Sequence, residues 1–289
     1  MQNFLINQAS KNCLLVSCII LISACGSKIK ETKDSVYSRH LQKHIDLNII
    51  STPVPKEKNS FNLLLLNDGQ DIEKLRAKDA VDSLYRKKMI QPLVVVSINA
   101  FDREKEYGVS GSPDYLNNGT LADKYALFIE NELLPFIKKR TGVRKFNSVT
   151  IAGCSLGGVS ALDFAWDHAD KINKVGIFSG SFWLRDMNAD DSTYSDEKDK
   201  IILNKVRASR KKPHLKYWFY VGGSEETADR DKDGIIDVID DTKDLIDLIK
   251  KKNVSPPQDI FYTEIKEGKH DYSSWSKVFP QFLVWAEGK

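Results

Sequence analysis

The sequence predicts one α/β domain in which helices flank a mainly parallel central sheet. Short apolar runs alternate with longer amphipathic segments, as in β-α-β units. Several runs are apolar on consecutive residues, which is typical of strands covered on both faces. A length of 289 residues with 41% hydrophobic content suits one large core. The predicted strands are HIDLNII (44–50), FNLLLL (61–66), PLVVVSI (92–98), SVTIA (148–152), KVGIFS (174–179), KYWFYV (216–221) and DIFYTEI (259–265).

Three segments have helical patterns. Residues 121–137 carry apolar side chains at helical spacing, and Pro135 predicts a kink there. Residues 156–166 (LGGVSALDFAW) directly follow a predicted strand. Residues 241–252 (DTKDLIDLIKKK) begin acidic and end basic, as the helix dipole prefers.

Residues 1–24 are predicted to be a signal peptide and not part of the fold. Lys11 provides a sparse positive region, and the apolar run CLLVSCIILI (13–22) is too short to span a bilayer. The small residues before Cys25 resemble a bacterial lipoprotein lipobox, which implies cleavage before Cys25 and lipidation of its sulfur. An ordinary signal peptide or an uncleaved anchor is the alternative.

Lipidation predicts export and attachment to the cell envelope. Gly26, not an aspartate, follows the cysteine, which favours the outer membrane if the host is Gram-negative. Residues 25–40 are polar and predict a tether, so the domain is expected to span 41–289. Only Cys154 then remains in the domain, so no intrachain disulfide is expected.

The charge distribution argues against a nucleic-acid partner. The formal net charge is +3, and basic residues are mixed with acidic ones along the chain. No basic block with interleaved aromatic residues is visible in the sequence.

The stretch TIAGCSLGG (150–158) predicts a nucleophile elbow. It fits G-x-S-x-G between a strand and a helix, which is the context that the motif needs. Gly153 and Gly157 leave room for the strained turn, and Ser155 would expose its Oγ at the carboxyl edge of the sheet. The N–H of Leu156 would then face a developing oxyanion. Cys154 is interpreted as a packing residue of the elbow.

The general base is assigned by elimination. Of five histidines, His270 alone lies in a loop after the last strand, at the same sheet edge as Ser155. The acid that orients His270 should follow the preceding strand, where Glu225 and Glu226 are the first carboxylates. Glu225 is favoured, Glu226 stays an alternative, and Asp229 and Asp271 are weaker candidates.

Three further features lie near the same edge. The loop after FNLLLL brings Gly69 and Gln70 as candidate backbone donors for the oxyanion hole, with an ordinary turn as the alternative. Phe182 and Trp183 follow KVGIFS and either line an acyl or aromatic pocket or belong to the core. Arg103 and Glu106 either pair with each other or form a solvated charged loop.

Residues 229–240 (DRDKDGIIDVID) match the spacing of a twelve-residue calcium loop. Oxygen ligands would stand at positions 1, 3, 5, 9 and 12, with Gly234 at position 6 and the carbonyl of Ile235 at position 7. The pattern departs from the usual loop at its last position, where an aspartate replaces glutamate. The alternative is an acidic turn that caps the following helix. The candidate side-chain ligands are Asp229, Asp231, Asp233, Asp237 and Asp240.

Taken together, these motifs resemble the esterase D-like family, which includes enterochelin esterases, feruloyl and acetyl-xylan esterase modules and bacterial mycolyltransferases. The motifs LLLLNDGQD, FDREKEYG, FIENELLPFI, GCSLGG and GKHDYSSW occur in the family's order over about residues 40 to 287. The resemblance implies an α/β-hydrolase fold and carboxylic ester hydrolysis. It matches Ser155 to the nucleophile and His270 to the base. The family's Gly-x-x-Asp/Glu pattern fits both Glu225 and Glu226, so it leaves the acid open.

The sequence thus predicts a serine esterase that forms an acyl-enzyme and needs no cofactor for chemistry, with structural calcium as an addition. The expected substrate is an acylated or feruloylated carbohydrate, a siderophore or a simple acyl ester. An acyltransferase on the same fold, or a non-catalytic surface lipoprotein that binds a glycan or siderophore, is the alternative.

Overall fold

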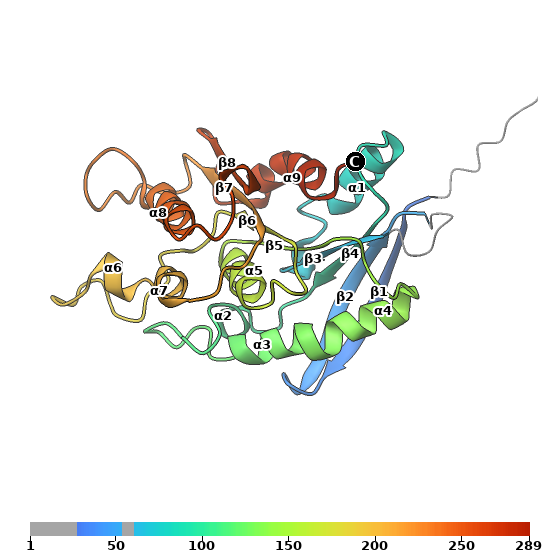
Figure 1. Cartoon of the computed structure of the whole chain (residues 1–289), viewed down its shortest axis with the longest axis horizontal. Helices are drawn as coiled ribbons and strands as arrows, with labels where there is room; N and C mark the ends of the chain where they lie inside the picture. Colours follow the sequence, from blue (N-terminus) through green and yellow to red (C-terminus); the bar gives the residue numbers. More distant parts are fainter. Residues whose placement is uncertain (1–27, 54–60) are drawn as a thin grey trace, which may run out of the picture.

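The computed structural model describes residues 28–53 and 61–289. The predicted signal peptide and the lipidation site at Cys25 lie outside these residues. The described chain folds around one eight-stranded sheet (Figure 1). None of the described helices is long and apolar enough to cross a membrane.

The strands lie in the order β1-β2-β4-β3-β5-β6-β7-β8. β1 pairs antiparallel with β2, β2 pairs antiparallel with β4, and every later pair is parallel. The carboxyl ends of the parallel strands therefore meet at one edge of the sheet. The strands are β1 (Lys30–Ser38), β2 (Lys43–Ser51), β3 (Asn62–Leu66), β4 (Leu93–Ile98), β5 (Val149–Cys154), β6 (Lys174–Phe178), β7 (Lys216–Gly222) and β8 (Ile260–Ile265).

The seven predicted strands correspond to β2 through β8. The prediction that residues 25–40 are a tether is wrong from Lys30 onward, because Lys30–Ser38 forms β1. This strand lies at the sheet edge, where one face stays exposed, so it needs backbone pairing more than apolar side chains. The folded domain therefore begins about ten residues earlier than position 41.

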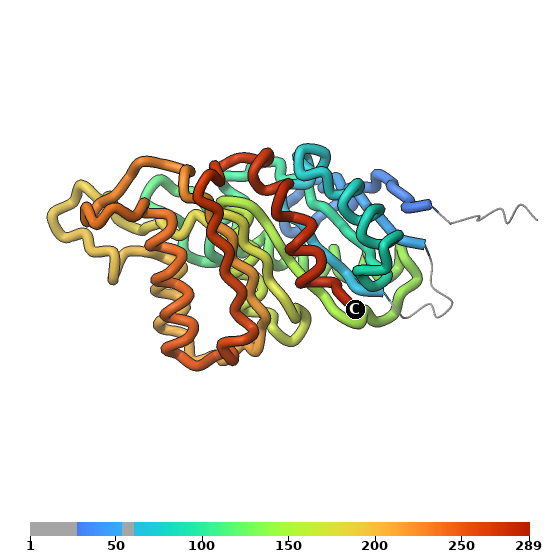
Figure 2. The backbone as a smooth tube through the Cα atoms, turned by 90° about the horizontal axis from the view of Figure 1, so that it is seen from above, coloured from blue at the N-terminus to red at the C-terminus, as the bar shows by residue number. Residues whose placement is uncertain are grey.

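Helices cover both faces of the sheet (Figures 1 and 2). α1 (Ala77–Arg86) and α9 (Tyr272–Glu287) pack together on one face, where they bury side chains such as Leu64 and Val95. The opposite face buries alternate strand residues such as Leu63 and Val94. This alternation explains why the strands are apolar on consecutive positions. The second face is covered by α3 (Ala122–Phe128), α4 (Leu134–Thr141), α5 (Leu156–Asp167), α7 (Ile201–Ala208) and α8 (Asp237–Lys251).

The predicted helix over 121–137 is interrupted before its proline. α3 runs into the π-helical turn η2 (Ile129–Leu133), and α4 then begins with Pro135 in its first turn. Leu133 and Leu134 keep helical dihedrals, so the backbone stays helical through the π turn, which comes shortly before the proline that cannot donate an N–H. The remaining short elements are η1 (Gly69–Asp71), α2 (Arg103–Glu106), α6 (Asp196–Asp199) and η3 (Pro257–Asp259).

Candidate active site

Ser155 is the single residue between β5 and α5. Its backbone has φ 55° and ψ −124°, a conformation that is costly for a residue with a side chain. A Cβ on Gly153 would lie 2.3 Å from the carbonyl oxygen of Gly157, and one on Gly157 would lie 2.7 Å from Asp68 Oδ2. Gly153 is therefore required by close backbone approach and Gly157 by the side chain of Asp68, and the turn has the form of a nucleophile elbow.

His270 lies in the loop between β8 and α9 and contacts Glu225. The distance from His270 Nδ1 to Glu225 Oε2 is 2.8 Å. The Glu225 side chain is 2% exposed and that of His270 is 39% exposed. A buried carboxylate on Nδ1 leaves Nε2 as the ring nitrogen that is free for proton transfer.

The second oxygen of Glu225 is held from the sheet edge. Ser179 Oγ and the N–H of Gly222 each donate to Oε1 at 2.5 Å. Trp275 Nε1 donates in turn to Ser179 Oγ at 2.9 Å. Sequence reasoning did not single out Ser179 or Trp275. Their signals were the position of Ser179 at the end of the predicted strand 174–179 and the place of Trp275 in GKHDYSSW.

The other acid candidates point elsewhere. Glu226 accepts a hydrogen bond from the N–H of Val238 in the first turn of α8 (2.7 Å), and burial raises the pKa of its carboxyl. Asp271 caps α9 by accepting from the N–H of Ser274 at 2.7 Å. Asp229 accepts from the N–H groups of Asp233 (3.2 Å) and Gly234 (3.0 Å) in the acidic loop. Of the candidate acids, the structure thus brings Glu225 alone to the ring of His270.

The Oγ of Ser155 pairs with that of Ser181 at 3.1 Å. Among the hydrogen bonds of residues 28–53 and 61–289, none joins Ser155 Oγ to His270. In structures without substrate, catalytic hydrogen bonds are often long or absent and form only in the complex. Ser181 was also missed at the sequence level, although it lies two residues beyond Ser179.

The candidate oxyanion donors come from two adjoining segments. Leu156 is the first residue of α5, and Gly69 and Gln70 begin η1, so their N–H groups lack intrahelical acceptors. The loop after β3 contacts α5 directly, because Asn67 Nδ2 donates to the carbonyl oxygen of Gly157 at 2.7 Å. Both predicted sources of donors therefore lie against each other at the elbow.

Neither alternative for Arg103 and Glu106, a mutual ion pair or a solvated charged loop, is correct. Arg103 Nε lies 2.8 Å from Asp68 Oδ1, and Glu106 Oε1 lies 2.8 Å from Lys43 Nζ. Both carboxylates are buried, at 2% and 0% side-chain exposure. Each basic side chain therefore compensates a buried acid from a distant segment, which local spacing does not reveal.

Phe182 and Trp183 have different environments. Phe182 is fully buried and packs on Phe219 with ring centroids 6.2 Å apart, so of the two alternatives it belongs to the core, and its pocket role is wrong. Trp183 is 47% exposed. It lines a cleft of about 200 Å³ together with Ser179, Gly180, Glu225, Glu226, Val238 and His270.

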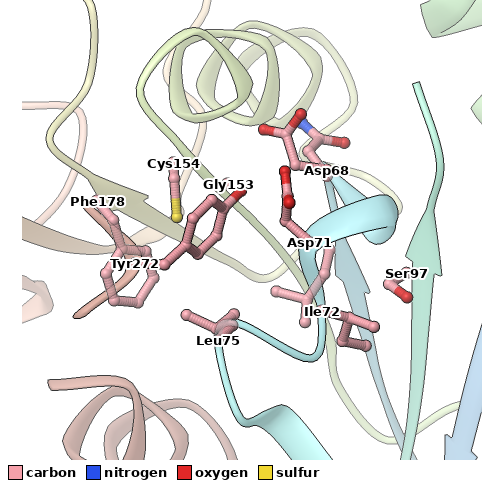
Figure 3. A pocket seen from close by; sticks show the side chains of 11 residues that line it. Asp68, Asp71, Ile72, Leu75, Ser97, Gly153, Cys154, Phe178 and Tyr272 are labelled. Carbon is pink, nitrogen blue, oxygen red and sulfur yellow. The ribbon is translucent and has the colours of Figure 1, made fainter. Parts of the chain in front are cut away.

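Cys154 lines a second, small cavity that is separate from the cleft at Trp183 (Figure 3). The cavity has a volume of about 10 Å³, room for about one water molecule. Tyr272, Asp68 and Asp71 line the same cavity. Burial raises the pKa of the Cys154 thiol well above its ordinary range, which fits a packing residue and not a nucleophile.

The acidic loop brings three of its five candidate side chains together. Carboxylate oxygens of Asp229, Asp231 and Asp233 lie within 4.8 Å of one another, and Gly234 has φ 91°. Asp237 instead accepts from the N–H of Arg230 at 2.9 Å and pairs with its guanidinium. The Asp240 carboxylate is not in the cluster. Burial, and then the charges of Asp233 and Asp231, raise the pKa of Asp240.

Comparisons with known proteins agree with this architecture. A family model described as "Putative esterase" matches residues 38–286. The uncharacterized protein YbbA of Bacillus subtilis (strain 168) is 25% identical over 239 residues, which are 81% of this chain and 88% of YbbA.

Solved structures show the same fold. A ferulic acid esterase has a TM-score of 0.66 at 19% identity, covering 90% of this chain and 98% of that one. The enterochelin esterase of Shigella flexneri has a TM-score of 0.67 at 20% identity, and the match covers 89% of this chain and 57% of that one. The siderophore hydrolase EstB of Aspergillus nidulans has a TM-score of 0.65 at 15% identity, and the match covers 87% of this chain and 93% of EstB. The chain thus spans little more than half of that enterochelin esterase.

The match of the family model over most of the chain, on a sheet whose carboxyl edge carries the serine elbow, shows that the protein belongs to this esterase family and is a carboxylic ester hydrolase with the α/β-hydrolase fold.

Proposed function

We propose that the protein is a serine esterase in which Ser155 is the nucleophile, His270 the general base and Glu225 the acid that orients it. The observation that carries this proposal is the contact between His270 Nδ1 and the buried Glu225, at the sheet edge where Ser155 occupies a strained elbow. Strain and a buried acid–imidazole pair are costly for stability and are typical of catalytic sites.

In the first half of the reaction, His270 Nε2 takes the proton of Ser155 Oγ while the oxygen attacks the ester carbonyl carbon. His270 then gives this proton to the leaving alcohol, and the acyl group stays on Ser155. In the second half, His270 takes a proton from water, the hydroxide attacks the acyl carbon, and the proton returns to Ser155 as the acid leaves. Glu225 accepts from the Nδ1–H of His270 and stabilises the imidazolium in both halves.

The contact between Ser155 and Ser181 must change before His270 can take the proton of Ser155 Oγ. Rotation of the Ser155 side chain would exchange the 3.1 Å contact with Ser181 Oγ for one with His270 Nε2. The oxyanion would be held by the N–H of Leu156 and by an N–H of Gly69 or Gln70, each being a preorganised donor at a helix start.

The substrate class is proposed from the cleft. Trp183 presents a half-exposed indole next to His270 and Glu225, and an indole face stacks well on a planar acyl group. Similar folds include a ferulic acid esterase and an enterobactin esterase. We therefore propose an ester with an aromatic acyl group, in a carbohydrate or siderophore, ahead of a simple acyl ester.

Two further expectations stay predictions. One is that Cys25 carries lipid and holds the enzyme at the cell envelope. The other is that residues 229–240 bind structural calcium, for which the clustering of Asp229, Asp231 and Asp233 is the supporting geometry.

The test of the proposed function is Ser155→Ala, with p-nitrophenyl acetate, methyl ferulate and a catecholate siderophore ester as substrates. We expect kcat to fall by on the order of 10⁶ and labelling by a fluorophosphonate probe to disappear. Ser35→Ala, which changes an exposed serine of β1, is the matched control. A Ser155→Ala protein with native circular dichroism and wild-type hydrolysis would overturn the proposal.

A further inference from the structure

One guanidinium contacts both backbone segments that carry the proposed oxyanion donors. Arg103 at the start of α2 donates from Nε to Asp68 Oδ1 (2.8 Å) and from Nη2 to Asp68 Oδ2 (3.2 Å). The same Nη2 donates to the carbonyl oxygen of Cys154 at 3.2 Å. Asp68 belongs to the loop after β3, and Cys154 is the last residue before the elbow. Arg103 therefore bridges the two sides of the oxyanion hole.

The loop after β3 depends on side-chain contacts for its shape. Asp68 has a left-handed backbone with φ 61°, which is unfavourable for a residue other than glycine. Its N–H donates to Tyr107 Oη at 2.9 Å, and Gln70 Nε2 donates to its Oδ1 at 3.0 Å. Burial raises the pKa of the Asp68 carboxyl, and the hydrogen bonds and charge of Arg103 oppose this rise. The guanidinium thus favours the ionised carboxylate that the loop is folded around.

We propose that Arg103 is a positioning residue that sets the distance between the oxyanion donor of the β3 loop and that of the elbow. The inference rests on the proposed function. The planar fork of arginine suits this task, because it meets both carboxylate oxygens of Asp68 while one of its nitrogens also reaches the carbonyl of Cys154. Lysine offers one point charge and no such fork.

The kinetic consequence follows from how oxyanion holes act. Donors stabilise the transition state when they lie about 2.7–3.1 Å from the developing oxyanion, and a misplacement of about 1 Å costs roughly 10²-fold in rate. The ground-state ester makes weaker use of these donors. Loss of the bridge is therefore expected to lower kcat and to weaken the binding of tetrahedral adducts, while KM stays nearly unchanged.

Two other roles for Arg103 predict different results. Its side chain is 37% exposed, so it has some access to a ligand. A direct contact with the substrate would raise KM together with or ahead of the loss in kcat. A purely structural ion pair would lower the melting temperature and leave the kcat of the folded enzyme unchanged.

The experiment compares Arg103→Gln, Arg103→Lys and the double variant Asp68→Asn/Arg103→Gln. For each folded protein, kcat, KM, the melting temperature and Ki for phenylboronic acid, which forms a tetrahedral serine adduct, are measured. We expect Arg103→Gln to lower kcat about 10- to 100-fold and to raise Ki by a similar factor, with KM within about threefold of wild type. The double variant, which buries no lone charge, should regain stability without regaining kcat.

Two matched controls distinguish the positioning role of Arg103 from the general effect of removing a buried or paired charge. Glu287→Gln changes a fully buried carboxyl at the opposite sheet edge, and Arg140→Gln removes an arginine that pairs with Asp34 away from the site. Both should keep the wild-type kcat and Ki.

Wild-type kcat in a folded Arg103 variant, a rise in KM alone, or recovery of kcat in the double variant would each overturn the inference. If Arg103→Gln does not fold, Arg103→Lys decides, because it keeps a positive charge opposite Asp68. Ser155→Ala is assayed alongside: its full activity would refute the proposed function, whereas an inactive Ser155→Ala beside a fully active Arg103 variant would refute the positioning role alone.

Discussion

Glu225 Oε2 lies 2.8 Å from His270 Nδ1, while its Oε1 accepts from Ser179 and Gly222 at the end of two neighbouring strands. The carboxylate is thus fixed on one side by the sheet and on the other by the imidazole. Trp275 extends this arrangement, because it donates to Ser179 and its ring packs edge-on against His270 with centroids 5.2 Å apart. The orientation of His270 is therefore set by both β7 and α9.

Glu225→Gln and Glu226→Gln form a matched pair of adjacent substitutions. We expect Glu225→Gln to lower kcat by roughly 10⁴, because an amide that donates to Nδ1 stabilises the wrong tautomer and cannot stabilise the imidazolium. Glu226→Gln keeps an oxygen to accept from Val238 and should lower kcat less than about tenfold. Steady-state kinetics on p-nitrophenyl acetate compares the two. A larger loss in Glu226→Gln would show that the acid is assigned to the wrong residue.

The calcium prediction is tested by stability as well as rate. Calcium at 100 times its dissociation constant should add about 2.7 kcal/mol to the free energy of unfolding, and EGTA should remove this gain. Asp231→Asn should weaken the effect, whereas Asp247→Asn on the exposed side of α8 should not. Because the loop begins shortly after Glu225, we also expect a higher esterase rate with calcium. Equal melting temperatures and rates in calcium and EGTA would refute the prediction.

The lipid anchor is tested in cells that express the full chain. Wild type should incorporate labelled palmitate and sediment with membranes, because lipid on Cys25 supplies the membrane affinity. Cys25→Ser should be unlabelled and should not sediment with the membranes. Cys154→Ser is the control, since its thiol is buried and should carry no label. Equal labelling of wild type and Cys25→Ser would contradict the prediction.

The sequence predicts those parts of the fold that follow from local pattern. β3 to β7 are recognisable because both of their faces are buried. The elbow is recognisable because neither Gly153, which faces backbone, nor Gly157, which faces the side chain of Asp68, leaves room for a Cβ. β1 was missed because it lies at the edge, where its backbone pairs with β2 and many of its side chains stay exposed. Burial of consecutive residues was the signal, and β1 does not have it. The other edge strand, β8, was still predicted because its sequence (IFYTEI) is rich in apolar and aromatic residues.

The contacts of the site depend on tertiary structure and were less predictable. Gly222 and Gly223 both fit the family spacing, so the choice between the two glutamates needed the position of His270. Arg103 pairs with Asp68 across 35 positions of sequence, and local spacing favoured Glu106 instead. Phe182 and Trp183 are adjacent and both aromatic, yet the direction of the chain after β6 buries one and exposes the other.

Glu287 predicts a pH dependence of stability that is separate from the active site. Its carboxylate is fully buried near the end of α9 and accepts from Thr150 Oγ1 and Asn62 Nδ2, each at 2.7 Å. Burial raises the pKa of Glu287 above its ordinary value near 4.5, against the opposing effects of these two hydrogen bonds and of Lys174.

The folded state therefore binds a proton at Glu287 more tightly than the unfolded state does. The contribution of Glu287 to stability falls as the pH rises from about 4.5 to the raised pKa of the folded state. Each difference of one in pKa between the two states corresponds to about 1.4 kcal/mol. Glu287→Gln removes this titration. Between pH 4.5 and the raised pKa, the free energy of unfolding of wild type should therefore fall relative to that of the variant. Urea unfolding at a series of pH values measures both curves. Parallel curves for the two proteins would mean that Glu287 titrates alike in the folded and unfolded states.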